Sequence, residues 1–127
     1  MDARPTPDTD HRFPRSVYGH GAEPDPRFSM ANERTFLAWI RTALALVAGG
    51  VALEALVAGI HPAFRLAAAV LLIVTGALVA AVAWFSWSRT ERRLRLSRPL
   101  PAPALVLPVA VAVVVTAVLI GAGMVAA

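Results

Sequence analysis

The chain contains no cysteine and no lysine, and Glu54 is its only charged residue between Arg41 and Arg65. The lack of cysteine excludes disulfides, thiol catalysis and cysteine metal sites. All twelve basic residues are arginines, whose guanidinium groups stay charged even when they are partly desolvated. Of the 127 residues, 57% are hydrophobic, which is too apolar for a small soluble domain. The composition therefore predicts a helical membrane protein.

Three apolar runs predict an all-α membrane protein with transmembrane helices at about 36–60, 66–88 and 104–126. The 19 residues from Thr42 to Ile60 would extend roughly 28 Å as a helix, close to the thickness of the hydrocarbon core. His61-Pro62 ends the first run, and a proline-rich segment precedes the third. The first run lacks a convincing cleavage site, so we expect it to be a retained helix.

The amino-terminal 27 residues differ from the rest in composition. They contain five prolines, two glycines and charges of both signs, so we expect a disordered cytoplasmic tail at 1–27, followed by a membrane domain at 28–127. Pro26 and Ser29 mark the start of the first helix. Either Ser29 or Asn32 could cap it, and Glu33 lies where the positive end of the helix favours an anion.

Charge and aromatic residues predict the orientation in the membrane. Five arginines and one acid, Glu91, lie between Arg89 and Arg98, whereas the turn at 61–65 contains one arginine. The positive-inside rule then places the amino terminus and this arginine-rich loop in the cytoplasm and the carboxyl terminus outside. Aromatic residues at 36–39 and 84–87 would lie at the same membrane face, because such residues favour the headgroup level.

Two arginines of the first helix share a face with small residues. On a helical wheel Arg34 lies about 20° from Arg41. Three small residues on and beside this face, Ala45, Gly49 and Ala52, would let a second membrane helix approach closely, which favours self-association and turns the arginines toward neighbouring helices or a polar lumen. The alternative is that Arg41 snorkels to lipid phosphates.

Glu54 and the arginines of the second loop each permit a functional and a structural interpretation. Glu54 is the only acid within a predicted span, which suggests a functional group, but it could instead be solvated or paired with Arg65 across the turn. The arginines of the second loop, which include Arg89, Arg92 and Arg93, could grip phosphate groups. Topology and attraction to anionic lipids would also explain them.

The remaining residue types exclude several functions. The three histidines lack cysteines or paired carboxylates at ligand spacing, so we expect no metal site. No catalytic constellation is evident, and the polar segments are too short for a closed pocket, so we expect neither enzymatic activity nor a cofactor. No recognition fold accompanies the positive charge, which argues against a nucleic-acid partner.

The segment from Phe28 to Leu46, with its central motif ANERTFLAWIRT at 31–42, closely resembles the signature of the domain-of-unknown-function family 202, the YidH-like small bacterial inner-membrane proteins. The motif includes Asn32, Glu33 and Thr35 at the start of the helix. The resemblance covers roughly residues 27–127 and implies a multi-pass protein of the bacterial inner (plasma) membrane.

The family also looks related to the membrane domain of the eukaryotic vacuolar transporter chaperone complex, in which comparable helices surround a basic pore for polyphosphate. By that resemblance, Arg34 and Arg41 would match pore-facing positions of the first helix, and the loop arginines would lie near the cytoplasmic mouth. This chain departs from the complex because it contains no soluble polymerase or phosphate-sensing domain.

We therefore expect a non-enzymatic integral membrane protein. It would form a homo- or hetero-oligomer with an arginine-lined cytoplasmic vestibule for phosphate-bearing anions, polyphosphate among them, or lipid headgroups. The alternative is a structural or regulatory membrane module whose arginines only set topology and bind lipid.

The charge distribution predicts a cytoplasmic amino terminus and an external carboxyl terminus. Reporter fusions at the carboxyl terminus should therefore be active only when the reporter functions outside the cytoplasm. A carboxyl-terminal reporter that is active only in the cytoplasm would contradict three spans with this orientation.

Overall fold

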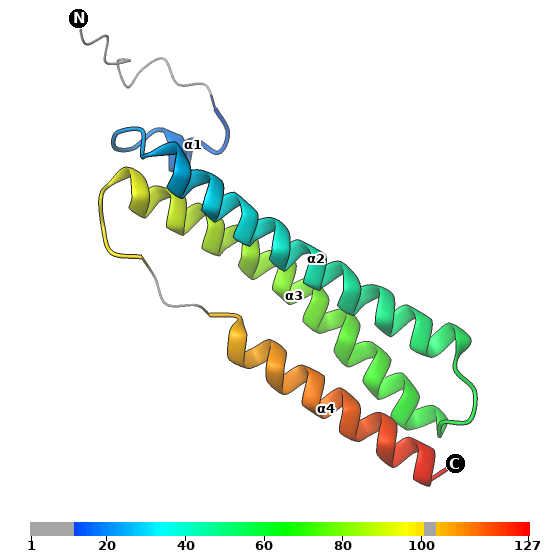
Figure 1. Ribbon diagram of the computed structural model, residues 1–127. Helices are drawn as coiled ribbons and strands as arrows, with labels where there is room; N and C mark the ends of the chain where they lie inside the picture. The colour runs from blue at the N-terminus through cyan, green and yellow to red at the C-terminus, as the bar shows by residue number, and fades with distance from the viewer. Residues whose placement is uncertain (1–11, 101–103) are drawn as a thin grey trace, which may run out of the picture. The chain divides into compact units, whose positions relative to one another are not determined.

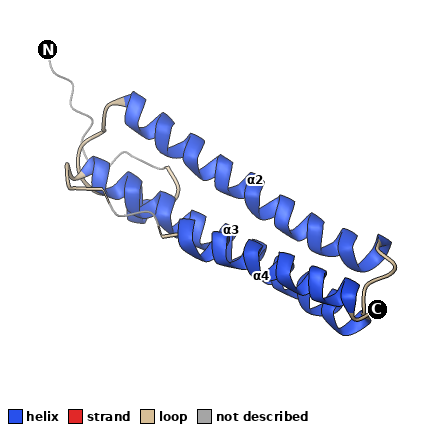
Figure 2. Ribbon diagram, turned by 60° about the horizontal axis from the view of Figure 1, so that its bottom comes forward, coloured by secondary structure: helices blue, strands red, loops and turns tan. Residues whose placement is uncertain are grey.

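The computed structural model describes residues 12–100 and 104–127, and the regular structure in this part of the chain is helical (Figure 2). A short helix, α1 (Arg15–Tyr18), precedes three long helices. These are α2 (Pro26–Leu56), α3 (Pro62–Arg95) and α4 (Val106–Val125) (Figure 1). The turn between α2 and α3 is short, and the two helices run side by side in opposite directions.

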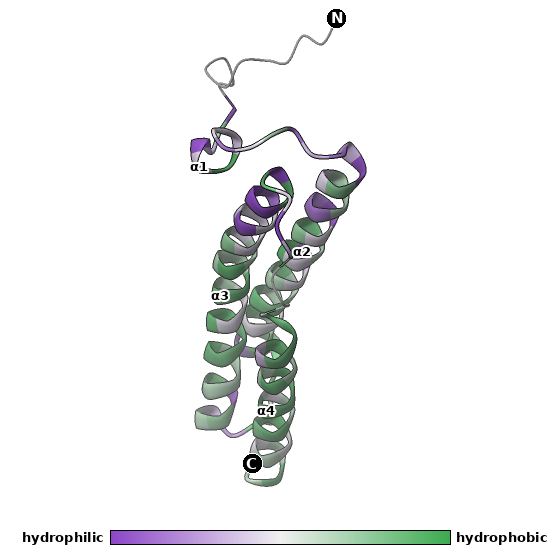
Figure 3. Ribbon diagram, turned by 90° about the vertical axis from the view of Figure 1, so that its left-hand side faces the viewer, coloured by the Kyte–Doolittle hydropathy of each residue, from purple (hydrophilic) through white to green (hydrophobic). Residues whose placement is uncertain are grey.

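The three long helices are each long and apolar enough to cross a membrane. Hydrophobic residues cover most of α3 and α4, and hydrophilic residues gather at the end of α3 and the beginning of α2 (Figure 3). This confirms the predicted all-α architecture with three spans. Exposed valines and leucines along these helices have the character expected of a lipid-facing surface.

The observed helix ends differ from the predicted span ends. The first helix begins at Pro26 and stops at Leu56, and the second continues from Pro62 to Arg95, well past the predicted end at Ser88. An apolar run indicates the part of a helix that lies in the hydrocarbon core, and the helix itself can be longer. Arginine and leucine are good helix formers, so α3 continues beyond its apolar run.

The caps of these helices also correct the prediction. Asp25 caps α2: its carboxylate accepts a hydrogen bond from the backbone N–H of Arg27 at 2.9 Å, and Pro26 occupies the first helical position. Ser29 and Asn32 lie inside the helix instead of at its start. A Schellman motif ends α3 at its carboxyl terminus. Ser97 has φ +52°, and the N–H of Arg98 donates to the carbonyl of Arg93 at 2.9 Å.

The chain divides into two compact units, and α2 and α3 pass through both. We call Met1–Phe36 with Trp84–Ala102 the polar unit, and Leu37–Ala83 with Pro103–Ala127 the apolar unit. Glu91 and Arg34 lie in the polar unit, and Arg41 lies in the apolar unit.

Glycine and alanine lie at close helix contacts of the apolar unit, beside larger side chains such as Leu53 and Ile60. Gly50 of α2 is buried against α3, and Gly76 of α3 is buried against Ala43 and Val47 of α2. Gly123 of α4 lies against Ile60 and Phe64. Small residues at these points let the backbones approach closely, which is the main source of packing energy between helices in lipid.

We predict opposite effects from two adjacent glycines of α2. A methyl group at Gly50 would lie 2.7 Å from both the carbonyl oxygen of Ala69 and a side-chain carbon of Ile73, whereas at Gly49 the nearest atom, in Leu72, would be 3.9 Å away. Gly50→Ala should lower the free energy of unfolding by about 1–3 kcal/mol through overpacking. Gly49→Ala should leave it unchanged or raise it by up to about 1 kcal/mol, because alanine favours the helix.

Unfolding of the purified protein in detergent, followed by circular dichroism, would compare the two variants. Equal stability of Gly50→Ala and Gly49→Ala would contradict the observed contact face of α2.

Candidate functional site

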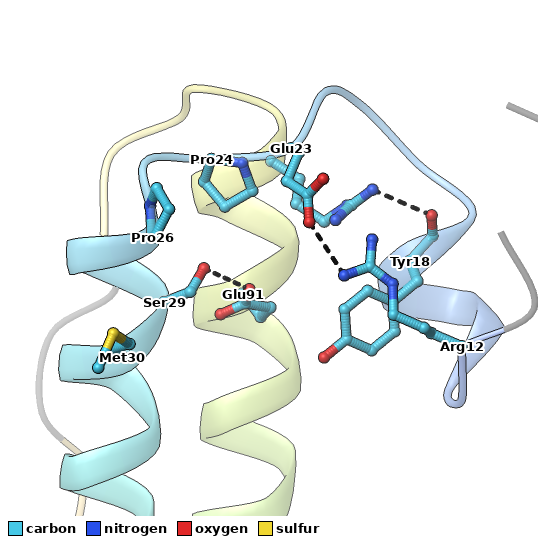
Figure 4. Close-up of a pocket in the computed structure, with 9 residues that line it drawn as sticks. Arg12, Tyr18, Glu23, Pro24, Pro26, Ser29, Met30 and Glu91 are labelled. Atoms are coloured by element: carbon cyan, nitrogen blue, oxygen red, sulfur yellow. Dashed lines mark hydrogen bonds and ion pairs between the residues drawn. The ribbon is translucent and has the colours of Figure 1, made fainter. Parts of the chain in front are cut away.

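Glu91 is a buried carboxylate in the polar unit. It lies on α3 with 4% of its surface exposed and accepts hydrogen bonds from two side chains of α2. The hydroxyl of Ser29 donates to Oε1 at 2.7 Å, and the amide of Asn32 donates to Oε2 at 3.1 Å (Figure 4). Asn32 also donates to the carbonyl of Trp87 at 3.2 Å. A buried charge is costly unless it is hydrogen-bonded, so this cluster holds α2 and α3 together in the polar unit.

The sequence interpretation missed Glu91 and gave Asn32 a different position. We predicted Asn32, Glu33 and Thr35 as a motif of the helix start, but all three lie within α2. Asn32 contacts α3, whereas Glu33 and Thr35 are exposed, and the Thr35 hydroxyl donates to the carbonyl of Ala31 at 3.1 Å. The spacing of Ser29, Asn32 and Phe36, which repeats every three to four residues, was the available signal for a contact face.

Residues 12–25 contact the end of α3 through Arg95. The Arg95 side chain, 7% exposed, donates from Nε to the carbonyl of His20 at 2.9 Å and from Nη2 to the carbonyl of Tyr18 at 3.2 Å. The N–H of Ala22 donates to the carbonyl of Arg95 at 3.2 Å, and Val17 is almost fully buried. The prediction of a disordered tail covered residues 1–27, of which 1–11 lie outside the described residues. Residues 12–25 instead supply carbonyl groups to a buried guanidinium that needs acceptors.

A second group of contacts lies along the same segment. The guanidinium carbon of Arg12 lies 4.6 Å from the centre of the Tyr18 ring and that of Arg95 lies 5.4 Å from it, so the ring makes a cation–π contact with each arginine. Arg12 also pairs with Glu23 at 3.0 Å (Figure 4).

These contacts surround a cavity of about 200 Å³. Ionisable and hydroxyl groups make up much of its lining, together with two prolines and Met30. The polar lining residues are Arg12, Tyr18, Glu23, Ser29, Glu91 and Arg95.

Aromatic residues of α2 and α3 pack together one to two helical turns away from the cavity residues Ser29 and Glu91. Phe36 lies 6.4 Å from Trp84 and 6.1 Å from Trp87, and the two tryptophans lie 5.3 Å apart, measured between ring centres. Phe13 stacks on Trp84 at 6.5 Å. The contacts of Phe36 confirm that aromatic residues of the two helices gather at one end. Their place at the headgroup level stays a prediction.

Arg34 and Arg41 lie on the face of α2 opposite the face that contacts α3. Asn32 and Gly50 both contact α3. They are 18 residues apart, which is five full helical turns, so they lie on the same face of α2. Both arginines lie about 160–180° around the helix from this face. Both are exposed, and neither makes a hydrogen bond or ion pair with the residues that the structure describes. Three small residues of α2 toward this side, Ala45, Gly49 and Ala52, are likewise exposed in the protomer.

Arg89, Arg92 and Arg93 lie on α3 instead of the predicted loop. Arg89 and Arg93 lie about 160° from Glu91 on the helical wheel, so they lie away from the side that contacts α2. Arg93 donates from Nη1 to the carbonyl of Pro99 at 3.0 Å, which supports the end of the helix. The protomer therefore does not bring Arg89 or Arg93 together with Arg34.

Glu54 pairs with Arg65 in the apolar unit. Its carboxylate lies 3.2 Å from Nε of Arg65, which also donates from Nη1 to the carbonyl of Val57 at 3.2 Å. This confirms the pairing with Arg65 across the turn that the sequence suggested for Glu54. Among residues 12–100 and 104–127, no group of three histidine or acidic side chains is placed to hold a metal ion.

The chain matches the family model described as "Domain of unknown function (DUF202)" over residues 27–93, which is more than half of its length. It is 46% identical to the inner membrane protein YidH of Escherichia coli strain K12 over 81 residues, which cover 63% of this chain and 70% of that protein. It is 44% identical to the uncharacterized protein Rv2272 of Mycobacterium tuberculosis strain H37Rv over 79 residues, which cover 61% of this chain and 65% of that protein.

No solved structure matches the chain significantly. The matched segment contains the Ser29–Asn32–Glu91 cluster and Arg34 and Arg41, whereas Arg12, Tyr18, Glu23 and Arg95 lie outside it. The chain belongs to the DUF202 family and is an integral, multi-pass protein of the inner membrane.

Proposed function

We propose that the protein is non-enzymatic and assembles, with itself or with a partner chain, around an arginine-lined cytoplasmic vestibule for phosphate-bearing anions or lipid headgroups. One observation carries the proposal: Arg34 and Arg41 are exposed, on one face, without a hydrogen-bond or ion-pair partner among the described residues. The polar groups that do converge are Ser29 and Asn32, and both donate to Glu91, which supports a structural role for the three residues.

The depth of Arg41 makes its lack of a partner informative. Phe36 packs in the aromatic cluster, and Arg41 lies five residues farther along α2, or about 7.5 Å along the helix, within the apolar unit. A charged side chain at the centre of a membrane helix costs about 2.5–3.5 kcal/mol, and ionisable residues in spans usually face a bundle interior or an aqueous cavity. A neighbouring protomer would provide such an environment for Arg41.

The next turns of α2 supply a surface for that neighbour. Ala45, Gly49 and Ala52 are exposed, and they continue the side of α2 that carries Arg41. A second copy on this surface would approach closely and would bring several copies of Arg34 and Arg41 around a shared space. Rings of arginine select anions by sign, and the guanidinium fork suits phosphate oxygens.

The alternative function is a structural or regulatory membrane module. Arg89 and Arg92 are exposed at the polar end of α3, where they could serve orientation and attraction to anionic lipid alone. Arg41 could also extend back to the headgroup level. The two functions differ in whether Arg41 binds a soluble polyanion.

We predict that Gly49→Leu disperses the oligomer, because its side chain would hold the helices apart at the surface of close approach. Native mass spectrometry of the purified protein in detergent would count the protomers. The matched control is Gly121→Leu on α4, since an added methyl group at Gly121 has no atom within 4 Å and one at Gly49 has only an atom of Leu72, at 3.9 Å. Identical oligomers in both variants would count against this face of α2.

We predict that Arg41→Gln weakens polyphosphate binding at least about tenfold, equivalent to about 1.4 kcal/mol, while insertion and assembly stay intact. Isothermal titration with polyphosphate, and with sulfate at equal charge, would measure the effect. Arg15→Gln is the control, because Arg15 is an exposed residue of α1. If neither variant alters binding, or if the unchanged protein binds no polyanion, the module without an anion site is the better account.

A further inference from the structure

Phe13 is the most exposed aromatic residue in the part of the chain that the structure describes, with 81% of its surface accessible. Its ring stacks on Trp84, with the ring centres 6.5 Å apart and the planes 26° apart. An aromatic ring that is left in water costs free energy, which burial in a less polar environment recovers. We propose that Phe13 is a membrane anchor, whose ring inserts among lipid headgroups beside Trp84 and holds residues 12–18 at the bilayer surface.

The fold holds the residues that follow Phe13 in place. Val17 of α1 is 1% exposed, and its backbone N–H donates to the carbonyl of Pro14 at 3.0 Å. Arg95 of α3 donates to two carbonyl groups that follow Val17 in the chain. A ring that is attached to an ordered segment loses less conformational entropy when it inserts than a ring on a flexible one. Lipid contact at Phe13 therefore adds to an order that the segment already has.

The ring of Phe13 joins an aromatic surface that continues the membrane-spanning part of α3. Trp84 lies near the end of the uncharged run 66–88, and it packs with Trp87 and Phe36. Tryptophan rings at the end of a span favour the headgroup level of the bilayer. Trp84 is 39% exposed, so lipid that covers its ring also meets the exposed side of Phe13. The occupant of this surface is therefore the bilayer that the spans already cross.

The neighbouring surface of α3 has the charge that lipid phosphates favour. Phe85 is 65% exposed, and Arg89 and Arg92 follow it after four and seven residues, so the three lie on one side of the helix. Both arginines are exposed. An aromatic residue followed by arginines is typical of the change from hydrocarbon to headgroups at the end of a span. This side of α3 thus supports a headgroup layer at the residues next to Trp84.

This anchor does not depend on the proposed anion vestibule. Arg34 and Arg41 lie on the face of α2 that points away from α3, whereas Phe13 contacts a ring of α3. Phe13 also lies outside residues 27–93, which match the family model. The anchor is therefore a property of the amino-terminal segment and adds a membrane contact to those of the three spans.

The lack of cysteine lets a single nitroxide label report the depth of this position. Phe13→Cys and Phe28→Cys would each be labelled in the full chain, in nanodiscs of phosphatidylcholine and phosphatidylglycerol. Phe28 is the matched control, because it is 59% exposed and lies eight residues, or about 12 Å along α2, before Phe36. The ratio of collisions with oxygen to collisions with a water-soluble nickel chelate should be at least about threefold higher at position 13, since oxygen concentrates in lipid and the chelate does not.

Unlabelled variants test the ring itself through hydrogen exchange of the Ala22 amide, which donates to the carbonyl of Arg95. Phe13→Ala should speed this exchange at least about threefold in nanodiscs, because the segment then opens more often. Phe13→Trp should retain the original rate, since tryptophan also favours the headgroup level, and Phe28→Ala should retain it as well. In amphipol, which has no headgroup layer, Phe13→Ala should have a smaller effect than in nanodiscs.

Equal collision ratios at positions 13 and 28 would overturn the proposal, because position 13 would then be no closer to lipid than the start of α2. The proposal is also wrong if Phe13→Ala speeds exchange equally in nanodiscs and in amphipol, since that result assigns the ring to its stack on Trp84 alone. An unchanged exchange rate in Phe13→Ala would show that the ring does not hold the segment, with the same consequence.

Discussion

The burial of the Glu91 carboxylate constrains the polar unit more than any other interaction. A carboxylate that is 4% exposed needs hydrogen-bond donors, and Ser29 and Asn32 of α2 supply them. Once Asn32 contacts α3, the rotation of α2 about its own axis is set. Arg34 follows two residues later, about 160° away around the helix, so it must lie on the outer face. The exposure of one charged group is thus a consequence of the burial of another.

The sequence was sufficient to predict the features that depend on hydropathy or on contacts between residues close together in the chain. Three apolar runs predicted three spans, and the distance from Glu54 to Arg65 across a short turn permitted their ion pair. It was not sufficient for Glu91, which was one acid among five arginines and could be explained by topology alone. Its burial depends on Asn32, about 60 positions away, and no local pattern reports that contact. Hydropathy likewise could not locate the end of α3, because a helix can continue into water where its residues favour it.

The small residues of α2 show a different limit of sequence reasoning. Small residues occur on two sides of the helix, with Ala43 and Gly50 on one and Ala45 and Ala52 on the other. Periodicity alone cannot assign these faces to α3, to another copy or to lipid. The close approach of Gly50 to Ala69 assigns the first face to α3. The second face is exposed in the protomer, so Gly50 has a folding role, whereas an assembly role for Gly49 is our proposal.

The charged groups of the protein therefore differ in whether the fold supplies a partner for their charge. Arg95 has backbone acceptors, Glu54 has Arg65, and Glu91 has neutral donors but no cation among the described residues. Arg34 and Arg41 have no such partner in that part of the chain. A charge near the membrane that its own fold leaves uncompensated gains most from an external group of opposite sign. On this argument a ligand or a partner chain contributes more at Arg41 and at Glu91 than at Arg95 or Glu54, where the fold already supplies the partners.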